Sequence, residues 1–312
     1  MISVIIPTYN RTIALEQISL HSLLNQNAQG FEIIVSDTST NAETECLVRD
    51  LQPSFHERGA SLRYLKASRK GTVSQRNEAI SVSAGDVLFF IDDDCEVSYD
   101  AISVIESYFD SFSWLKGLGL PLVSITPPHH GESLLVKLGR FVFGDGPSDK
   151  RKVTAATRNI FPFADVPGNA EWLSGGSLAV RRDVFKEIGF DEKLETFSPY
   201  ASCEDHDFTH RLFLHYGQPL IVANGGQVIH HKYGGRRFEE DWRRPACFFY
   251  NTWRARENFL RYKKYPLLPF LWSMRIGLPF FLLRQGFNFS VIMRGYHEYK
   301  KAARETAKEQ KS

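Results

Sequence analysis

The first hundred residues predict a Rossmann-like, doubly wound α/β fold, in which helices flank a mainly parallel sheet. Short apolar runs rich in β-branched residues alternate there with longer stretches whose apolar residues recur at helical spacing. Such alternation is typical of βαβ units, which connect parallel strands by right-handed crossovers. The chain has 312 residues, enough for one large domain or two smaller ones.

Each expected element follows from its own pattern. Strands that are buried on both faces are short, apolar and β-branched. The expected strands are residues 3–6, 32–35, 62–65 and 87–91. The expected helices between them, from apolar residues at helical spacing, are 12–24 and 73–82.

The middle of the chain is less regular. Frequent prolines and glycines over residues 112–170 predict a long connection with irregular structure. Regular elements are then expected as a strand over 172–180, a helix over 182–188, a helix after Glu204 and a strand over 227–230.

Composition excludes several classes of protein. With 43% hydrophobic and 24% charged residues, the chain is an ordinary globular protein, and a net charge of +2 gives no reason to expect a nucleic-acid partner. The four cysteines are far apart and form no CxxC pair, so neither a zinc site nor a disulfide scaffold is expected. The N-terminus has no basic segment followed by a secretory apolar run, so we expect a cytoplasmic protein.

Polar residues follow the expected strands and should meet at one edge of the sheet. Thr8 follows the first strand, Asp37 the second, and the aspartates 92–94 the fourth. In a parallel sheet the carboxyl ends of the strands lie together, and ligands bind in the crevice there. The sequence therefore predicts a polar ligand site built from segments far apart along the chain.

The run Asp92, Asp93 and Asp94 points to a divalent cation. Adjacent carboxylates raise one another's pKa, and a bound cation removes that cost. Oxygen ligands favour Mg²⁺ or Mn²⁺ over softer metals, and substrate phosphates commonly fill the remaining positions. The alternative is a solvated acidic turn or a helix N-cap, since Asp100 lies nearby.

Two further pairs are candidates for the same site. His230 and His231 follow an apolar run, so one imidazole is a candidate metal ligand; a packed or surface histidine pair is the alternative. Glu204 and Asp205 precede a helical pattern, where carboxylates stabilise a helix start. Either of these acids is also a candidate general base for an acceptor hydroxyl.

The remaining candidates each have a structural alternative. Asp37 either belongs to a turn or accepts a hydrogen bond from a base or a ribose hydroxyl. Arg11 and Arg76 are candidate partners for a diphosphate, with solvated charges as the alternative. The candidates for a sugar or acceptor pocket, with strand packing as the alternative, are Trp172, Gly175 and Gly176.

Seven motifs in one order carry a family resemblance. They are VIIPTYNR (4–11), SDTS (36–39), FIDDDCEV (90–97), WLSGGSLAVRRDVF (172–185), GFDE (189–192), CEDHDFTHRL (203–212) and VIHH (228–231). Over about residues 2–232 the sequence resembles the family 2 glycosyltransferases of the GT-A fold, of the kind that builds bacterial surface polysaccharides. The resemblance depends on all seven motifs occurring in the order found in this family.

The resemblance implies a metal-dependent, inverting transfer from a nucleotide-diphospho-sugar to a hydroxyl of a glycan or lipid-linked acceptor. It assigns Mg²⁺ or Mn²⁺ to Asp92 and Asp94, completed by His230, and the catalytic base to Asp205, with Glu204 beside it. The expected nucleotide-sugar site consists of Pro7, Thr8, Tyr9, Arg11, Asp37, Arg76, Asp92 and Asp93.

The C-terminal part differs in character, so we expect a catalytic domain over 1–232 and a basic, aromatic helical extension over 233–312. Residues 232–264 carry ten Lys and Arg against four Asp and Glu. The apolar run 265–283 is interrupted by three prolines and an arginine. We expect this run to be a peripheral patch that contacts the anionic inner face of the cell membrane. The alternatives are that it packs inside the domain, that it forms a dimer contact, or that it spans the membrane.

Two other functions are alternatives to a glycosyltransferase. A sugar nucleotidyltransferase would need a glycine-rich phosphate loop with a lysine near the N-terminus, and residues 4–11 contain neither residue type. A non-catalytic sugar-nucleotide-binding protein would retain its function without Asp205.

Overall fold

The structure is a computed structural model of the 312-residue chain, and it describes all residues except 125–150, 161–165, 232, 234–240 and 310–312. Its strands are β1 (Ile2–Thr8), β2 (Glu32–Asp37), β3 (Ser61–Lys66), β4 (Val87–Phe90), β5 (Cys95–Val97), β6 (Gly117–Gly119), β7 (Leu122–Ser124), β8 (Gly168–Ala170), β9 (Leu178–Arg181), β10 (Leu220–Val222) and β11 (Val228–His230). Its α-helices are α1 (Thr12–Ala14), α2 (His21–Leu24), α3 (Glu43–Glu57), α4 (Thr72–Val82), α5 (Ala101–Ser111), α7 (Glu204–Tyr216), α8 (Arg243–Phe259), α9 (Leu267–Trp272), α10 (Leu278–Arg284) and α11 (Phe289–Glu309).

The central sheet confirms the predicted α/β class. Its eight strands lie in the order β3-β2-β1-β4-β9-β6-β10-β8. The four expected N-terminal strands pair in parallel, β1 with β2 and β4, and β2 with β3. This arrangement brings the carboxyl ends of these strands to one edge, where Thr8 pairs with Asp37 in register.

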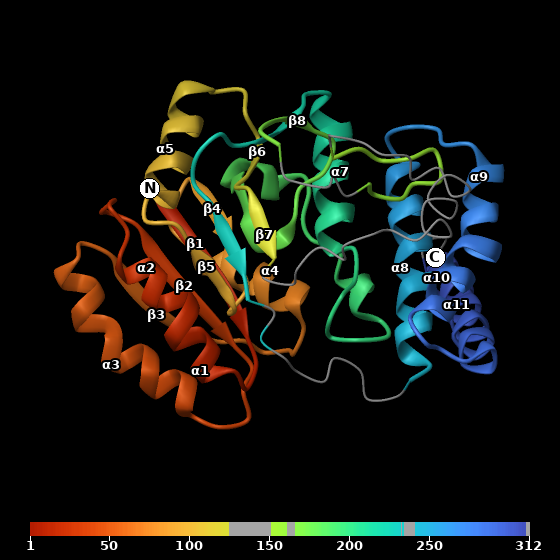
Figure 1. Ribbon diagram of the computed structural model, residues 1–312, viewed down its shortest axis with the longest axis horizontal. Coiled ribbons are helices and arrows are strands. Elements are labelled where there is room, and N and C mark those ends of the chain that lie inside the picture. Colours follow the sequence, from red (N-terminus) through yellow and green to blue (C-terminus); the bar gives the residue numbers. More distant parts are fainter. Residues whose placement is uncertain (125–150, 161–165, 232, 234–240, 310–312) are drawn as a thin grey trace.

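Helices cover both faces of this sheet, as the continuous apolar strands predict. On β1, Ile2, Val4 and Ile6 point into one core cluster, to which α3 and α5 contribute, and Ile5 points into the other. The second cluster includes apolar residues of α4 and α7. Figure 1 shows α3 and α7 on opposite sides of the sheet. The sheet is therefore a buried, rigid platform for the residues at its edge.

A second, three-stranded sheet places the histidine motif. Its order is β5-β11-β7, and β11 pairs antiparallel with β5 so that His230 lies opposite Cys95. Since β5 follows the aspartate run directly, this pairing brings a residue from position 230 to the aspartates. The expected strand over 227–230 is confirmed as β11.

Three expected elements differ in detail. Residues 12–24 are helical, but a π-helical turn, Leu15–Leu20, separates α1 from α2. The expected strand over 172–180 is wrong in its first part, because Gly175–Ser177 is a 3₁₀ turn and the strand begins at Leu178. The helix over 182–188 is a 3₁₀ helix, Arg182–Lys186. Much of the expected irregular connection over 112–170 lies outside the described residues.

The expected C-terminal helices are present and have a core of their own. Helix α8 packs against α7 of the sheet domain and against α11, and Figure 1 shows α8–α11 gathered at one end of the molecule. Their core contains Phe249, Tyr250 and Leu282. The expected domain boundary at 232 falls where residues 232 and 234–240 lie outside the described part of the chain.

Candidate active site

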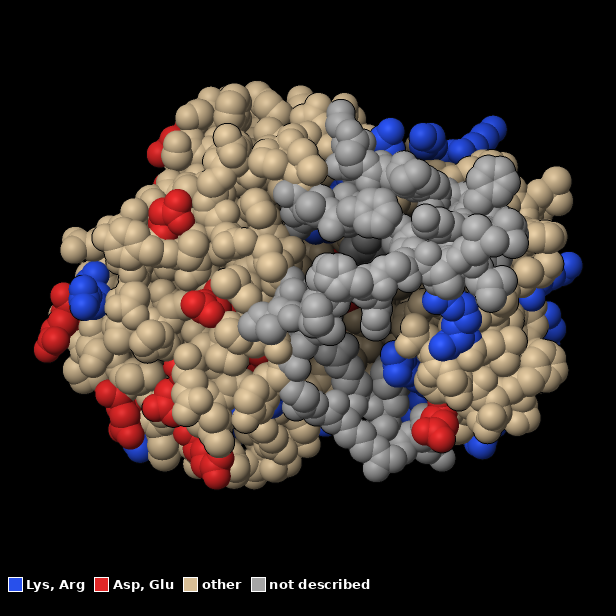
Figure 2. All heavy atoms as spheres, viewed as in Figure 1, with Lys and Arg blue, Asp and Glu red and all other residues tan. Residues whose placement is uncertain are grey.

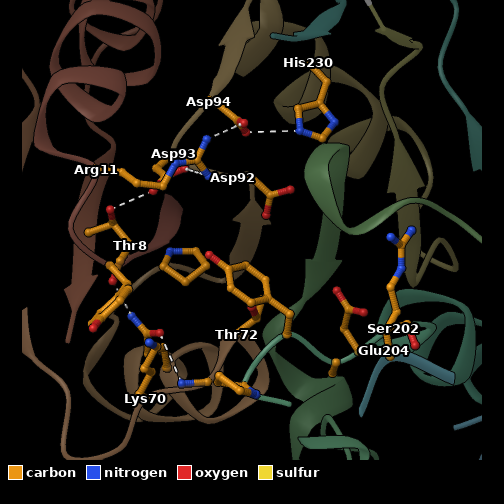
Figure 3. A pocket seen from close by; sticks show the side chains of 18 of the residues that line it. Thr8, Arg11, Lys70, Thr72, Asp92, Asp93, Asp94, Ser202, Glu204 and His230 are labelled. Atoms are coloured by element: carbon orange, nitrogen blue, oxygen red, sulfur yellow. Dashed lines mark hydrogen bonds and ion pairs between the residues drawn. The ribbon is translucent and has the colours of Figure 1, made fainter. Parts of the chain in front are cut away.

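A cavity of about 730 Å³ opens at the carboxyl edge of the sheet. It is lined by Pro7, Thr8, Tyr9 and Arg11 after β1, by the aspartates 92–94 after β4, and by Glu204 and His230. Figure 3 shows Glu204 across the cavity from Thr8. The structure thus brings together residues that the sequence separates by more than 200 positions.

Asp93 points toward β1 and is held there by two partners. Its carboxylate accepts a hydrogen bond from Thr8 Oγ1 at 2.7 Å and pairs with Arg11 Nη1 at 2.8 Å. Burial raises the pKa of Asp93 to about 7, against the opposing effects of Arg11 and Thr8. Both partners sit on the first loop, so Asp93 ties that loop to the end of β4.

Asp94 lies between Arg11 and His230 (Figure 3). Its carboxylate is 2.7 Å from Arg11 Nη2 and 3.1 Å from His230 Nε2, and it accepts the backbone N–H of Tyr233 at 2.9 Å. Burial alone would raise the pKa of Asp94, but the bonds to His230 and Arg11 outweigh it and hold this pKa well below its usual range. Asp94 is therefore an ionised, buried carboxylate.

Four side chains form a cluster that fits a divalent cation. Asp92, Asp94, Cys95 and His230 each offer one ligand atom, and these atoms lie within 4.8 Å of one another. Burial raises the pKa of the Cys95 thiol well above its usual value, so Cys95 stays protonated and is a poor ligand for a hard ion. The remaining donors, two carboxylates and an imidazole, suit a divalent metal. His231 points elsewhere, with Nε2 at 2.7 Å from Glu96 Oε2.

Arg76 is buried behind the site, where it joins two of the candidate carboxylates. Its guanidinium lies 3.1 Å from Asp92 Oδ1 and 3.4 Å from Glu204 Oε1, and it donates to the Gly175 carbonyl at 3.2 Å. Only 1% of the Arg76 side chain is exposed, and it does not line the cavity. In this structure Arg76 positions carboxylates instead of facing a diphosphate.

The Glu204–Asp205 pair begins α7, and its two side chains have different surroundings. Glu204 lines the cavity, and burial together with the charge of Asp205 raises the pKa of Glu204 to about 8. Asp205 accepts backbone N–H bonds from Gly175 at 3.0 Å and His206 at 2.7 Å. Burial raises the pKa of Asp205, although these two bonds oppose the shift.

The two glycines of the WLSGG motif separate these groups. A Cβ at Gly175 would lie 3.0 Å from Arg76 Nη1 and 3.2 Å from Asp205 Cβ. A Cβ at Gly176 would lie 3.4 Å from Asp92 Oδ2. The backbone of this 3₁₀ turn therefore passes close to Asp205 and Asp92, and a side chain at either glycine would crowd them.

Besides Arg76, five expected site residues do not line the cavity: Asp37, Trp172, Gly175, Gly176 and Asp205. Trp172 is fully buried and donates from Nε1 to the Ile160 carbonyl, so its ring packs in the interior and forms no wall of this cavity. Asp37 is also buried; its carboxylate accepts from the backbone N–H of Ser39 at 2.8 Å and from Tyr64 Oη at 3.0 Å. In this structure Asp37 braces the loop after β2.

Three groups of cavity residues were not predicted from the sequence, and the first of them, residues 199–202, lies just before the Glu204–Asp205 pair. Lys70, Gly71, Thr72 and Gln75 follow β3 at the same sheet edge, a signal that strand order alone could have supplied. The third group, Asp241, Arg244, Phe248 and Phe287, comes from the C-terminal helices and the segments beside them, and nothing local in the sequence places it here.

Comparisons with known proteins agree with this site. Residues 3–112 match the family described as glycosyl transferase family 2. The GalNAc(5)-diNAcBac-PP-undecaprenol β-1,3-glucosyltransferase of Campylobacter jejuni is 31% identical over 106 residues, which cover 33% of this chain and 33% of that protein. The chain thus matches about a third of the length of this relative.

Solved structures show the same fold along nearly the whole chain. TarS 1–349 of S. aureus, in complex with UDP-GlcNAc, has a TM-score of 0.60 at 18% identity, covering 96% of this chain and 81% of TarS 1–349. The mannosyltransferase PcManGT of Pyrobaculum calidifontis, in complex with GDP-Man and Mn²⁺, has a TM-score of 0.56 at 16% identity, covering 99% and 79%. The motifs, the architecture and these matches agree: residues 3–112 match glycosyl transferase family 2, and the chain as a whole has the GT-A fold of these solved structures.

Proposed function

We propose that this protein transfers a sugar from a nucleotide-diphospho-sugar to a hydroxyl of a glycan or lipid-linked acceptor in bacterial surface polysaccharide synthesis, with inversion at the anomeric carbon. The observation that carries this proposal is the shared cavity. Asp92, Asp94 and His230 line one part of it, and Glu204 lines another. A donor diphosphate and an acceptor hydroxyl both need groups of these kinds, within reach of one another.

We propose Mg²⁺ or Mn²⁺ as the cation, held by Asp92, Asp94 and His230. Such an ion stabilises the charge that develops on a departing diphosphate. Arg11 lies against Asp94 and favours its ionised form, the form that binds metal. PcManGT, which shares the fold, was solved with Mn²⁺ and GDP-Man.

For the donor, we propose that the nucleotide lies along Pro7, Thr8 and Tyr9. Thr8 and Arg11 are already bonded to Asp93, so this part of the cavity is preorganised. Lys70 lies with Nζ 3.3 Å from the centre of the Tyr9 ring and adds a positive charge at the wall where we place the nucleotide. Asp37 supports the neighbouring loop from behind.

We propose that one carboxylate of the Glu204–Asp205 pair is the general base that deprotonates the acceptor hydroxyl. A raised pKa is what a general base near neutral pH requires, and burial raises the pKa of both acids. The resemblance assigns the proton transfer to Asp205, and Glu204 is its cavity-lining neighbour. A single displacement inverts the anomeric centre and needs no covalent nucleophile.

We also propose that the extension, residues 233–312, holds the protein at the inner face of the cell membrane. One helical stretch in the described part of the chain, Leu267–Arg284, is long and apolar enough to cross a membrane, with a mean hydropathy of 1.3 and 33% of its residues buried. An exposed row along it, which we call the apolar stripe, consists of Leu268, Trp272, Ile276, Phe280 and Leu283. Spacings of three or four residues put these side chains on one helix face.

Charge complementarity supports a peripheral, anionic-membrane contact for this stripe. Residues 258–297 contain six Lys and Arg and no Asp or Glu. In Figure 2 the blue residues gather at the end formed by the C-terminal helices, and most red residues lie at the other end. Basic residues beside exposed apolar ones suit the headgroup region of an anionic leaflet.

The enzymatic proposal is tested by a donor screen. Purified full-length protein is incubated with UDP-, GDP- and dTDP-sugars and Mn²⁺, and release of the nucleoside diphosphate is measured. We expect at least one donor to be hydrolysed slowly, chelation by EDTA to stop hydrolysis, and Mg²⁺ or Mn²⁺ to restore it. Asp94→Asn should behave like the chelated protein, whereas the surface control Asp50→Asn should match wild type. A protein that binds and hydrolyses no donor, with or without metal, would refute the proposal.

A further inference from the structure

We propose that the C-terminal helices build an acceptor subsite in the cavity, where Arg244 binds the phosphate of a lipid-linked acceptor and Phe248 and Phe287 contact its apolar chain. This inference rests on the proposed function and names the acceptor class for that same site. It concerns three cavity residues that nothing else in the site explains.

The three residues form one wall. Arg244 and Phe248 are four positions apart on α8, so they lie on the same face of that helix. The Arg244 guanidinium carbon lies 5.5 Å from the centre of the Phe287 ring, which follows the end of α10. This wall shares the cavity with the aspartates 92–94 and with Glu204, so a ligand held on it can present a hydroxyl to the catalytic residues.

Arg244 differs from Arg11 and Arg76 because it has no acidic partner in the part of the chain that the structure describes. Arg11 pairs with Asp93 and Asp94, and the buried Arg76 is bonded to Asp92 and Glu204. Within the described residues, no carboxylate lies at ion-pair distance from Arg244. Its planar guanidinium is therefore available to an anion, and phosphate is the anion whose geometry it fits best.

The apolar partners connect this wall with the apolar stripe. The Phe248 ring packs against Phe281 of α10, with ring centres 5.8 Å apart. Phe281 is the neighbour of Phe280, whose exposed side chain belongs to the stripe. The contact between Phe248 and Phe281 therefore joins this wall to α10, the helix that also carries Phe280 and Leu283 of the stripe.

These features together favour one ligand class. A neutral glycan can stack on aromatic rings but leaves the Arg244 charge without an anion. A free phosphate uses the arginine but not the rings. An amphiphile with a phosphate or diphosphate between an apolar chain and a sugar uses all three side chains and leaves the sugar toward Glu204.

The test uses farnesyl diphosphate as the probe, with farnesol and inorganic diphosphate as its two halves. Full-length protein is first saturated with UDP, GDP or dTDP, whichever the donor screen identifies, so that the donor site is filled. Binding is then measured by calorimetry. We expect farnesyl diphosphate to bind at least about tenfold more tightly than either half, because the charge and the chain contribute together.

Variants assign that binding to the wall. Arg244→Ala should weaken farnesyl diphosphate binding about tenfold or more, and Arg244→Lys, which keeps the charge, should weaken it less. Arg284→Ala, an exposed arginine of α10 outside the cavity, is the matched control and should bind like wild type. Thermal unfolding of each variant shows that it is folded, and unchanged nucleotide binding shows that the donor site is intact.

Three results would overturn the inference. Farnesyl diphosphate binding that Arg244→Ala does not change would remove Arg244 from the subsite. Equal binding of farnesol would mean that no phosphate is recognised. Displacement of the bound nucleotide by farnesyl diphosphate would place the probe in the donor site. Each is distinct from failure of the proposed function, which the donor screen detects without any acceptor.

Discussion

At the scale of single residues, three adjacent aspartates occupy three different environments. Asp93 is bonded to Thr8 and Arg11, Asp94 to Arg11 and His230, and Asp92 to the buried Arg76. A run of identical residues carries no information about which member faces which partner. The partners come from positions 8, 11, 76 and 230, so only the folded chain distinguishes the three carboxylates.

We predict that Asp93 and Asp94 respond differently to the same substitution. Asp93→Asn keeps a side chain that can bond Thr8, and the pKa of about 7 means that Asp93 already carries a proton part of the time near neutrality. Donor hydrolysis by Asp93→Asn should therefore fall by no more than about tenfold. Asp94→Asn should lose about a hundredfold or more, because an ionised metal ligand is removed. Equal losses in both variants, measured as kcat at saturating Mn²⁺, would show that our division of the run is wrong.

We predict that Asp205→Asn abolishes transfer and that Glu204→Gln leaves its pH dependence unchanged. A general base works only when deprotonated, so kcat/KM falls as the pH drops below its raised pKa. The pKa of Glu204 is about 8, so Glu204 is mostly protonated over the pH range in which Asp205 titrates, and Glu204→Gln should leave the position of this fall unchanged. Asp205→Asn should lose about 10²–10⁴-fold in kcat while it still binds nucleotide. If Glu204→Gln is the inactive variant and Asp205→Asn retains turnover, Glu204 is the base.

At the scale of elements, α7 is fixed to its neighbours by buried polar groups. Asp207 is bonded to Arg211 on its own helix and to Asn258 of α8, and Asn258 also donates to Asp191 at 2.9 Å. His210 contacts the Glu171 carbonyl at 2.9 Å and Tyr265 Oη at 2.7 Å. The helix that begins with Glu204 and Asp205 is therefore held in place by the C-terminal helices.

The bridge between α7 and α8 gives one prediction. Asn258→Ala leaves the buried Asp207 Oδ1 without its donor and leaves Asp191 Oδ2 with Arg254 alone, so the free energy of unfolding should fall by about 1–3 kcal/mol. Since α7 carries the proposed base, displacing this helix should lower kcat, and the change in KM should be smaller. Urea unfolding and steady-state kinetics measure the two effects. The exposed Asn27→Ala serves as control, and an Asn258→Ala protein with wild-type stability would contradict the role of this bridge.

His210 predicts a pH dependence of stability. Burial lowers the pKa of His210 to about 4, so the unfolded chain, in which this histidine titrates near 6.5, binds more protons between those pH values. The contribution of His210 to the free energy of unfolding is thus fully present above pH 6.5. It is lost as the pH falls toward 4, by about 3 kcal/mol in total. His210→Gln should flatten this dependence in urea unfolding at pH 7.0 and 4.5. The exposed His21→Gln should not, and an unchanged slope in His210→Gln would refute the assignment.

At the scale of the whole molecule, the apolar stripe and the basic residues around it predict binding to anionic vesicles. The protein should sediment with phosphatidylglycerol vesicles at low salt and much less with phosphatidylcholine vesicles, because charge attraction and apolar insertion act together. Trp272→Glu with Phe280→Glu should reduce binding by about tenfold or more and leave donor hydrolysis unchanged. High salt should weaken wild-type binding.

A control variant and two further measurements distinguish membrane binding from the other possible roles of the apolar stripe. Tyr99→Glu places the same charge on an exposed aromatic position of the sheet domain, and its vesicle binding should match wild type. A concentration-dependent dimer that the stripe variant abolishes would show that a second copy covers the stripe. Extraction from cells only by detergent, and not by alkaline carbonate, would show a true span.

The sequence alone determined the α/β class, the four parallel strands and the edge at which the aspartates lie. These features depend on local patterns, since the alternation of β-branched runs with helical spacing fixes the topology, and parallel pairing then collects the strand ends. The same reasoning identified His230 and the Glu204–Asp205 pair, because each adjoins a regular element.

Only the tertiary structure decided the other features. It buried Arg76 between Asp92 and Glu204, turned Trp172 and Asp37 into supporting residues, and brought Arg244, Phe248 and Phe287 into the cavity. These outcomes depend on contacts between segments that lie far apart in the sequence. A local pattern sets which face of an element is buried, whereas the packing of whole helices and sheets sets which distant side chain that face meets.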